Sequence, residues 1–312
     1  MEYYLHTVDM PLSEIKIFYK ELNNRQFLAL SKINLILPLN EETAADYATI
    51  FREIILESVK NKEDFLKLNI IDYILYLAKL REITVGEDLE LYIKDVNVSD
   101  MPIKFNLKIS SFIQRLYNLA KESLPNNNLT IDNFNIEIDW PNLQDEEFFL
   151  KKLPNDSLSF ADKVITSVPY FIKKITFNGN CIDLINLNFK EKTQIYNNLP
   201  FSIRQNIQSL IIESVLKLKN GDIWNVKHLQ EFSNGIDLYN VSYQAILRLF
   251  FSDDISGILE EYYMLASKGI EPFYLDSISV AERKVYITLL AKELEAMGSK
   301  EGKGGDDFES LR

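Results

Sequence analysis

The residue types that most often carry catalysis or bind metals are scarce in this chain. Its only histidines are His6 and His228, and its only cysteine is Cys181. A nucleophilic triad or a zinc site needs several such side chains, so the sequence predicts no catalytic residues, no metal and no cofactor. Cys181 lies within an apolar strand pattern, and we expect it to be a small buried core residue. We interpret His228 as a surface or capping residue.

Carboxylates, glycines and tryptophans offer weaker signals. Among 46 Asp and Glu residues, an adjacent pair such as Asp253-Asp254 is expected by chance, and helix capping explains its position. The segment 302–305 is glycine-rich but lacks the preceding strand and following helix of a phosphate loop. Trp140 and Trp224 fit core or interface anchors better than a base-stacking platform. An enzyme of carboxylate type, such as a hydrolase, would require a concave site with perturbed acids.

The helix expected to position the most distinctive residues begins near Asn69. Apolar residues between Ile70 and Leu80 fall on nearly every side of this helix, which is typical of a buried helix. Asn69 can cap its start, and Asp72 three residues later suits a capping box. At the other end, Gly86 can take positive φ as the chain turns into a strand.

This helix ends in Leu80-Arg81, followed after four residues by Gly86-Glu87. The ending resembles the Leu-Arg-x-x-Ser-x-Gly-Glu signature of the small baseplate hub subunits of T-even-type (T4-like) bacteriophages, with Thr84 in place of Ser. Two roles remain open for the motif. Arg81 can pair with a nearby carboxylate while Gly86 turns the chain, or the four residues Leu80, Arg81, Gly86 and Glu87 can contact a partner.

Further elements follow from periodicity and turn signals. The spacing of Ile15, Phe18, Tyr19 and Leu22 predicts a helix opening at Met10-Pro11. The other predicted elements are an apolar run at 27–37, helices at 43–59, 112–124 and 201–219, a hairpin at 89–109, a strand at 134–140, a hairpin around Asn178-Gly179 (171–177 with 182–187), a capping-box helix from Asn188, a strand at 236–238, a helix through Phe250 and a helix from the capping box 279–282.

The same order of motifs is found in the hub subunits, and the resemblance covers about the middle two-thirds of the chain. Its segments here are 80–87, 89–109, 136–141, 191–200 and 236–251. The chain departs from the pattern by its extra helices at both ends. The resemblance implies a non-catalytic structural or assembly component of a contractile phage tail baseplate hub, with other tail or hub proteins as partners. It also implies a location in the host cytoplasm during assembly or in the virion tail.

Charge and hydrophobic composition disfavour two other classes of protein. The net charge of −12 disfavours a nucleic-acid adaptor, which usually shows a basic face, and no apolar run is long enough to span a membrane. The oligomeric state does not follow from the sequence. We expect an α+β fold, mostly helical, with short antiparallel hairpins between helices. The expected divisions are an N-terminal helical segment at 1–66, a hub-like region at 67–252, C-terminal helices at 253–297 and a flexible tail at 298–312.

The C-terminal helix carries an apolar stripe beside this tail, formed by Ile287, Leu290, Leu294 and Met297. Such a stripe can belong to the protein's own core or can dock a partner. The sequence leaves both roles open.

Overall fold

The computed structural model describes residues 5–36, 44–93, 103–123, 128–143, 160–220, 250–251 and 255–301. Its helices are α1 (Asn24–Ile36), α2 (Ala44–Leu56), α3 (Lys62–Phe65), α4 (Ile70–Thr84), α5 (Ile109–Ser123), α7 (Phe160–Phe171), α8 (Phe189–Asn197), α9 (Phe201–Asn220), α12 (Ile255–Ser267), α13 (Pro272–Ser277) and α14 (Val280–Glu301). Its strands are β1 (His6–Met10), β2 (Ile15–Tyr19), β3 (Asp88–Ile93), β4 (Ile103–Lys108), β5 (Asn128–Ile131), β6 (Phe134–Ile138), β7 (Ile172–Phe177) and β8 (Asn180–Asp183).

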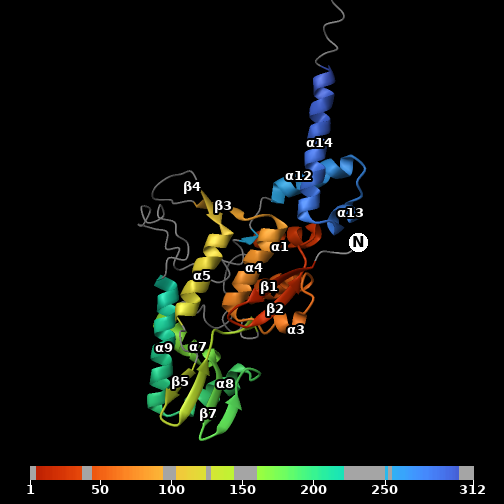
Figure 1. The fold of residues 1–312 in the computed structure, drawn as a ribbon. Helices are drawn as coiled ribbons and strands as arrows, with labels where there is room; N and C mark the ends of the chain where they lie inside the picture. Colours follow the sequence, from red (N-terminus) through yellow and green to blue (C-terminus); the bar gives the residue numbers. More distant parts are fainter. Residues whose placement is uncertain are drawn as a thin grey trace, which may run out of the picture.

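These elements confirm a mostly helical α+β fold with short antiparallel sheets. The strands form two hairpins, β1-β2 and β3-β4, and one four-stranded sheet in the order β5-β6-β7-β8. That sheet lies at one end of the molecule, and α14 projects from the opposite end (Figure 1). Among the described residues, no helix is long and apolar enough to cross a membrane.

Helix α4 lies in the middle of the molecule (Figure 1) and is buried along most of its length, as its sequence predicts. The Asn69 side chain caps it by accepting a hydrogen bond from the Asp72 N–H at 2.8 Å. The second half of the expected capping box is not formed. The Asp72 carboxylate instead accepts the N–H groups of Leu12 and Ser13, and the Asn69 N–H donates to the Ser13 hydroxyl.

The helix expected from Met10 onward is wrong, because this segment forms the β1-β2 hairpin. Burial alternates along β2, where Ile17 and Tyr19 are buried and Lys16 is exposed. Asp72 holds the connecting turn through the bonds just described, and Glu14 takes a positive φ of 54° there. The described residues between 5 and 20 therefore place a hairpin at the start of the N-terminal segment predicted at 1–66.

The β7-β8 hairpin is confirmed, with Asn178 and Gly179 both at positive φ, 48° and 81°. Such a two-residue turn fixes the register, which pairs Ile175 with Ile182 and Thr176 with Cys181. Cys181 is exposed, as are the other three residues of the edge strand β8, including Ile182 on the opposite face. The expectation of a core cysteine is therefore wrong, because both faces of this strand are exposed.

The C-terminal helix starts at Ser279, whose hydroxyl accepts the Glu282 N–H at 3.1 Å, as expected for a cap. It ends at Glu301 rather than at Met297. The predicted tail from Gly298 therefore begins with helix, and its remaining residues lie outside the described part of the chain. The other predicted features that lie outside it are Trp224, His228, the strand at 236–238, Asp253-Asp254 and the glycines of 302–305.

Candidate partner interface

Within the part of the chain that the structure describes, the residues best suited to chemistry are not assembled into a site. The His6 ring packs on Tyr19 at 5.8 Å, and Trp140 is a core residue whose ring lies 5.8 Å from Phe171. Among the described residues, no group of three or more His, Cys, Asp or Glu side chains is placed to hold a metal ion.

Two carboxylates, the buried Asp72 and the half-buried Asp139, have perturbed pKa values. Burial raises the pKa of Asp72 despite its hydrogen bonds from Ser13 and Leu12. Burial also raises the pKa of Asp139 to about 6, although the nearby Lys173 ammonium acts in the opposite direction. Asp139 accepts the backbone N–H of Trp140 at 2.7 Å. Both acids thus hold backbone segments in place, which is a structural use of a buried or half-buried carboxylate.

The motif at the end of α4 makes contacts inside the molecule. Leu80 and Arg81 are buried, and Arg81 Nη1 donates to the Phe250 carbonyl at 3.0 Å. The Thr84 hydroxyl accepts the Leu22 N–H at 3.2 Å, which a serine hydroxyl in this position can also do. Helix α4 is thereby connected to the segment before α1 and to Phe250.

Gly86 and Glu87 connect α4 to the next hairpin and to α5. Gly86 has a φ of 124°, a conformation that favours glycine. The Glu87 carbonyl accepts the Ile109 N–H at 3.1 Å, and the Glu87 carboxylate accepts the Ser110 hydroxyl at the start of α5. These contacts lie within the protein and fit the structural alternative for Leu80, Arg81 and Gly86, with the Phe250 carbonyl as one partner of Arg81.

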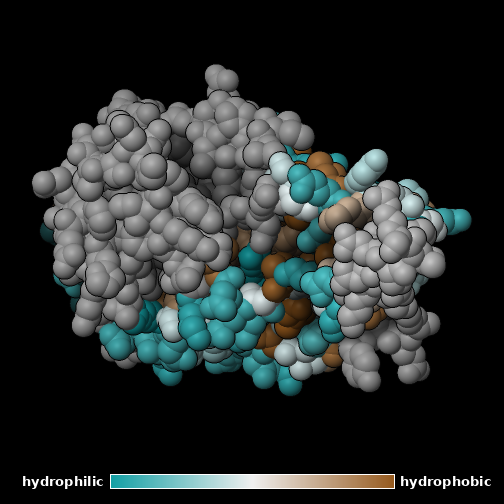
Figure 2. All heavy atoms as spheres, turned by 90° about the horizontal axis from the view of Figure 1, so that it is seen from above, coloured by the Kyte–Doolittle hydropathy of each residue, from teal (hydrophilic) through white to brown (hydrophobic). Residues whose placement is uncertain are grey.

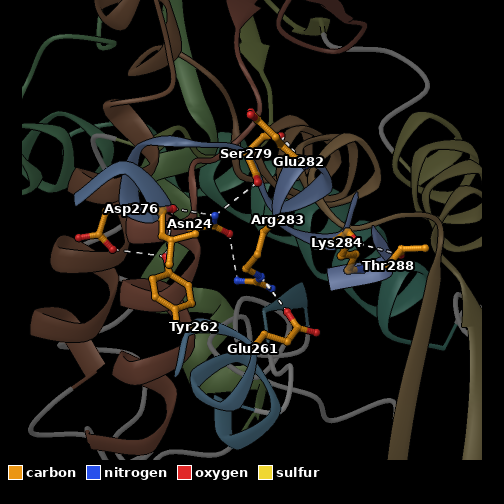
Figure 3. A network of polar contacts seen from close by, with 10 residues as sticks. Asn24, Glu261, Tyr262, Asp276, Ser279, Glu282, Arg283, Lys284 and Thr288 are labelled. Carbon is orange, nitrogen blue, oxygen red and sulfur yellow. Dashed lines mark hydrogen bonds and ion pairs between the residues drawn. The ribbon is translucent and has the colours of Figure 1, made fainter. Parts of the chain in front are cut away.

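The C-terminal helices α12, α13 and α14 are attached to α1 by a buried polar cluster (Figure 3). Arg283 on α14 is only 2% exposed. Its Nε lies 2.8 Å from Glu261 Oε2 on α12, and its Nη1 donates to Asn24 Oδ1 at 2.9 Å. Asn24 in turn donates from Nδ2 to the Leu275 carbonyl at 2.8 Å and from its N–H to the Ile278 carbonyl at 3.0 Å. One asparagine therefore contacts both α13 and α14.

The apolar stripe of α14 is buried at one end and exposed at the other. Ile287 and Leu290 pack with Leu265 and neighbouring apolar residues of α12 and α13, and Leu290 is 9% exposed. Leu294 and Met297 continue the stripe but are 49% and 51% exposed, because α14 extends beyond the body of the protein (Figure 1). We call Leu294 and Met297 the distal stripe.

Helix α12 carries a second exposed apolar surface. Ile258 and Leu265 are buried on its inner side, while Leu259, Tyr263 and Met264 are exposed. These three residues, together with Glu260, line a shallow pocket of about 430 Å³. Figure 2 looks onto this end of the molecule and shows hydrophobic side chains reaching the surface among hydrophilic ones. We call Leu259, Tyr263 and Met264 the outer face of α12.

Sequence reasoning missed both the outer face and the attachment through Arg283. An all-round apolar helix such as α12 ordinarily indicates a buried helix, so periodicity does not separate its two sides. The hydrogen bond between Asn24 and Arg283 joins residues 259 positions apart, and no local pattern in the sequence predicts it.

Comparison with family models relates the chain to a known protein family. The family model described as T4 bacteriophage base plate protein matches residues 7–220, more than half of the chain. No curated protein and no solved structure matches significantly. The chain therefore belongs to the T4 bacteriophage base plate protein family. The match begins at residue 7, within the N-terminal segment predicted at 1–66, and ends at residue 220, the last residue of α9. The helices α12, α13 and α14 therefore lie outside the match.

Proposed function

We propose that this member of the T4 bacteriophage base plate protein family is a non-catalytic subunit or assembly factor of the baseplate hub in a contractile tail. In this proposal the protein acts through contacts with other tail and hub proteins, in the host cytoplasm during assembly or in the finished tail. Family membership supports a structural component of the phage baseplate with baseplate partners. The hub assignment rests on the ordered motifs of the sequence.

The distal stripe of α14 is the observation that carries the mode of action. Leu294 and Met297 have the same helical spacing as Ile287 and Leu290, which the protein buries against its own helices. An amphipathic helix that extends past its own core presents the anchors used in helix-in-groove recognition. The net charge of −12 keeps such a protein soluble before assembly. We therefore assign partner docking to the distal stripe.

Co-purification with the hub proteins of the same phage tests the proposal. Leu294→Asp places a charge in the docking stripe, and we expect it to abolish co-purification while leaving the circular dichroism spectrum unchanged. Leu289→Asp is the matched control, because Leu289 is 57% exposed on another side of the same helix and should retain binding. If Leu294→Asp binds as well as the unmodified chain, the docking assignment is wrong.

The alternative of an enzyme of carboxylate type is tested separately. The two perturbed acids, Asp72 and Asp139, have structural hydrogen-bond partners, and neither lines the pocket on α12. We therefore expect no turnover in a screen of hydrolase substrates. Activity that is lost on Asp139→Asn in a folded protein would contradict a purely structural role.

A further inference from the structure

The outer face of α12 has a composition that solvent exposure does not explain. Tyr263 is 78% exposed, and Leu259 and Met264 are 45% and 40% exposed. The three side chains are neighbours on the helix surface, since residues four apart lie one turn apart. A cluster of exposed apolar residues on one helix, next to polar ones, is typical of a protein–protein contact.

The pocket on this face indicates which kind of partner fits. It is lined by four residues of one helix, Leu259, Glu260, Tyr263 and Met264. When two helices pack, a side chain of one inserts into a hole formed by four residues of the other. The pocket therefore offers a place into which one side chain of a second helix can insert.

Two charged residues on or next to this face indicate which partner fits. Glu260 lies near the middle of α12, between Leu259 and Tyr263, and Lys268 follows the last residue of the helix. Both are exposed, and neither has an ion-pair partner within the described part of the chain. The two residues are eight positions apart, about 12 Å along a helix. In an antiparallel pair of α12 helices related by a two-fold axis near Met264, each Glu260 lies at the level of the Lys268 of the other copy.

We propose that the outer face of α12 binds the same face of a second copy of this chain, forming an antiparallel, two-fold symmetric dimer. Such an interface is self-complementary, as required when one patch contacts its own copy. Tyr263 and Met264 lie next to the two-fold axis and provide the apolar contact, and Glu260 with Lys268 set the antiparallel orientation. The proposal does not depend on docking through the distal stripe, which lies on α14 rather than on α12.

The mass of the full chain in solution provides the test. Sedimentation velocity over a dilution series at physiological ionic strength should show a concentration-dependent monomer–dimer equilibrium. At that ionic strength the repulsion between two acidic copies is screened over about 8 Å. Tyr263→Ser should raise the dimer dissociation constant about tenfold or more, as for an aromatic residue at the centre of an interface. Phe273→Ser is the matched control, because Phe273 is 84% exposed on the neighbouring α13, and it should leave the constant unchanged.

A charge exchange tests the orientation. Glu260→Lys and Lys268→Glu should each weaken the dimer, because like charges then face one another across the axis. The double variant carrying both changes should restore it. All these positions are exposed, so circular dichroism should show folded protein throughout. A strictly monomeric chain, a dimer that Tyr263→Ser does not weaken, or a double variant that fails to recover would each overturn the proposal.

Discussion

Asp139 is a half-buried carboxyl whose protonation contributes to folding. Burial raises its pKa from 3.8 to about 6, so the folded state binds this proton more tightly than the unfolded state. The resulting stabilisation is fully present below pH 3.8 and is lost as the pH rises through about 6. The free energy of unfolding should therefore fall over this window.

Replacing this carboxyl by an amide gives the first prediction. Asp139→Asn keeps the shape and the acceptor for the Trp140 N–H but cannot ionise. At each pH, the free energy of unfolding of the unmodified protein is compared with that of the variant. Between pH 4 and pH 7 the unmodified protein should lose on the order of 2 kcal/mol relative to the variant. Urea denaturation at several pH values measures this difference. A difference that increases with pH would mean that Asp139 is ionised in the folded protein, paired with Lys173.

Gly86 gives the second prediction at the residue scale. A Cβ built at this glycine meets no heavy atom within 4 Å, so the cost of a side chain comes from the φ of 124° alone. Gly86→Val should lower the free energy of unfolding by roughly 1–3 kcal/mol, and Gly86→Ala should have a similar effect. An unchanged urea midpoint in both variants would show that the turn accepts other residues.

The structural role of a single residue could be predicted where it depends on residues nearby in the sequence. The Asn188–Glu191 capping box and the Asn178-Gly179 turn are confirmed, since both follow from a few adjacent residues. The prediction for Cys181 was wrong because its strand, β8, lies at the edge of the sheet and is exposed along its whole length. The place of a strand in a sheet depends on distant segments and does not appear in a local pattern.

Among the elements, the attachment of the C-terminal helices depends on one buried arginine. Removing one partner from a buried ion pair typically costs about 3–5 kcal/mol, so Arg283→Ala should release α12–α14 from α1. Hydrogen exchange in residues 255–297 should accelerate while α4 stays protected. Lys284→Ala changes the adjacent exposed residue and should be neutral within about 0.5 kcal/mol. Equal protection of α14 in both variants would contradict the importance of Arg283.

Helices and strands were predictable where the length of a segment and the spacing of its apolar residues indicate the same kind of element. The helices α2, α5 and α9 and the β3-β4 hairpin follow their apolar patterns. The segment 10–22 was misread because Ile15, Phe18 and Tyr19 fit helical spacing as well as alternation. Asp72, about 60 residues away, holds the turn that makes it a hairpin. A long-range contact of this kind does not appear in a local pattern.

At the scale of the whole molecule, the match to the family covers the core and stops at α9, whereas both exposed apolar surfaces lie on α12 and α14. The described residues pack their apolar side chains around α4, and the sequence predicts no metal site. We therefore predict that adding EDTA leaves the melting temperature unchanged in a thermal scan. A clear fall would reveal a structural metal.

We propose that assembly of the baseplate hub requires this chain and its distal stripe. To test this requirement, the coding region for this chain is interrupted in the phage, and the resulting particles are examined by electron microscopy. We expect heads without complete baseplates, restored by supplying the unmodified chain or Leu289→Asp but not Leu294→Asp. Infectious particles with normal baseplates in the absence of the chain would contradict the claim.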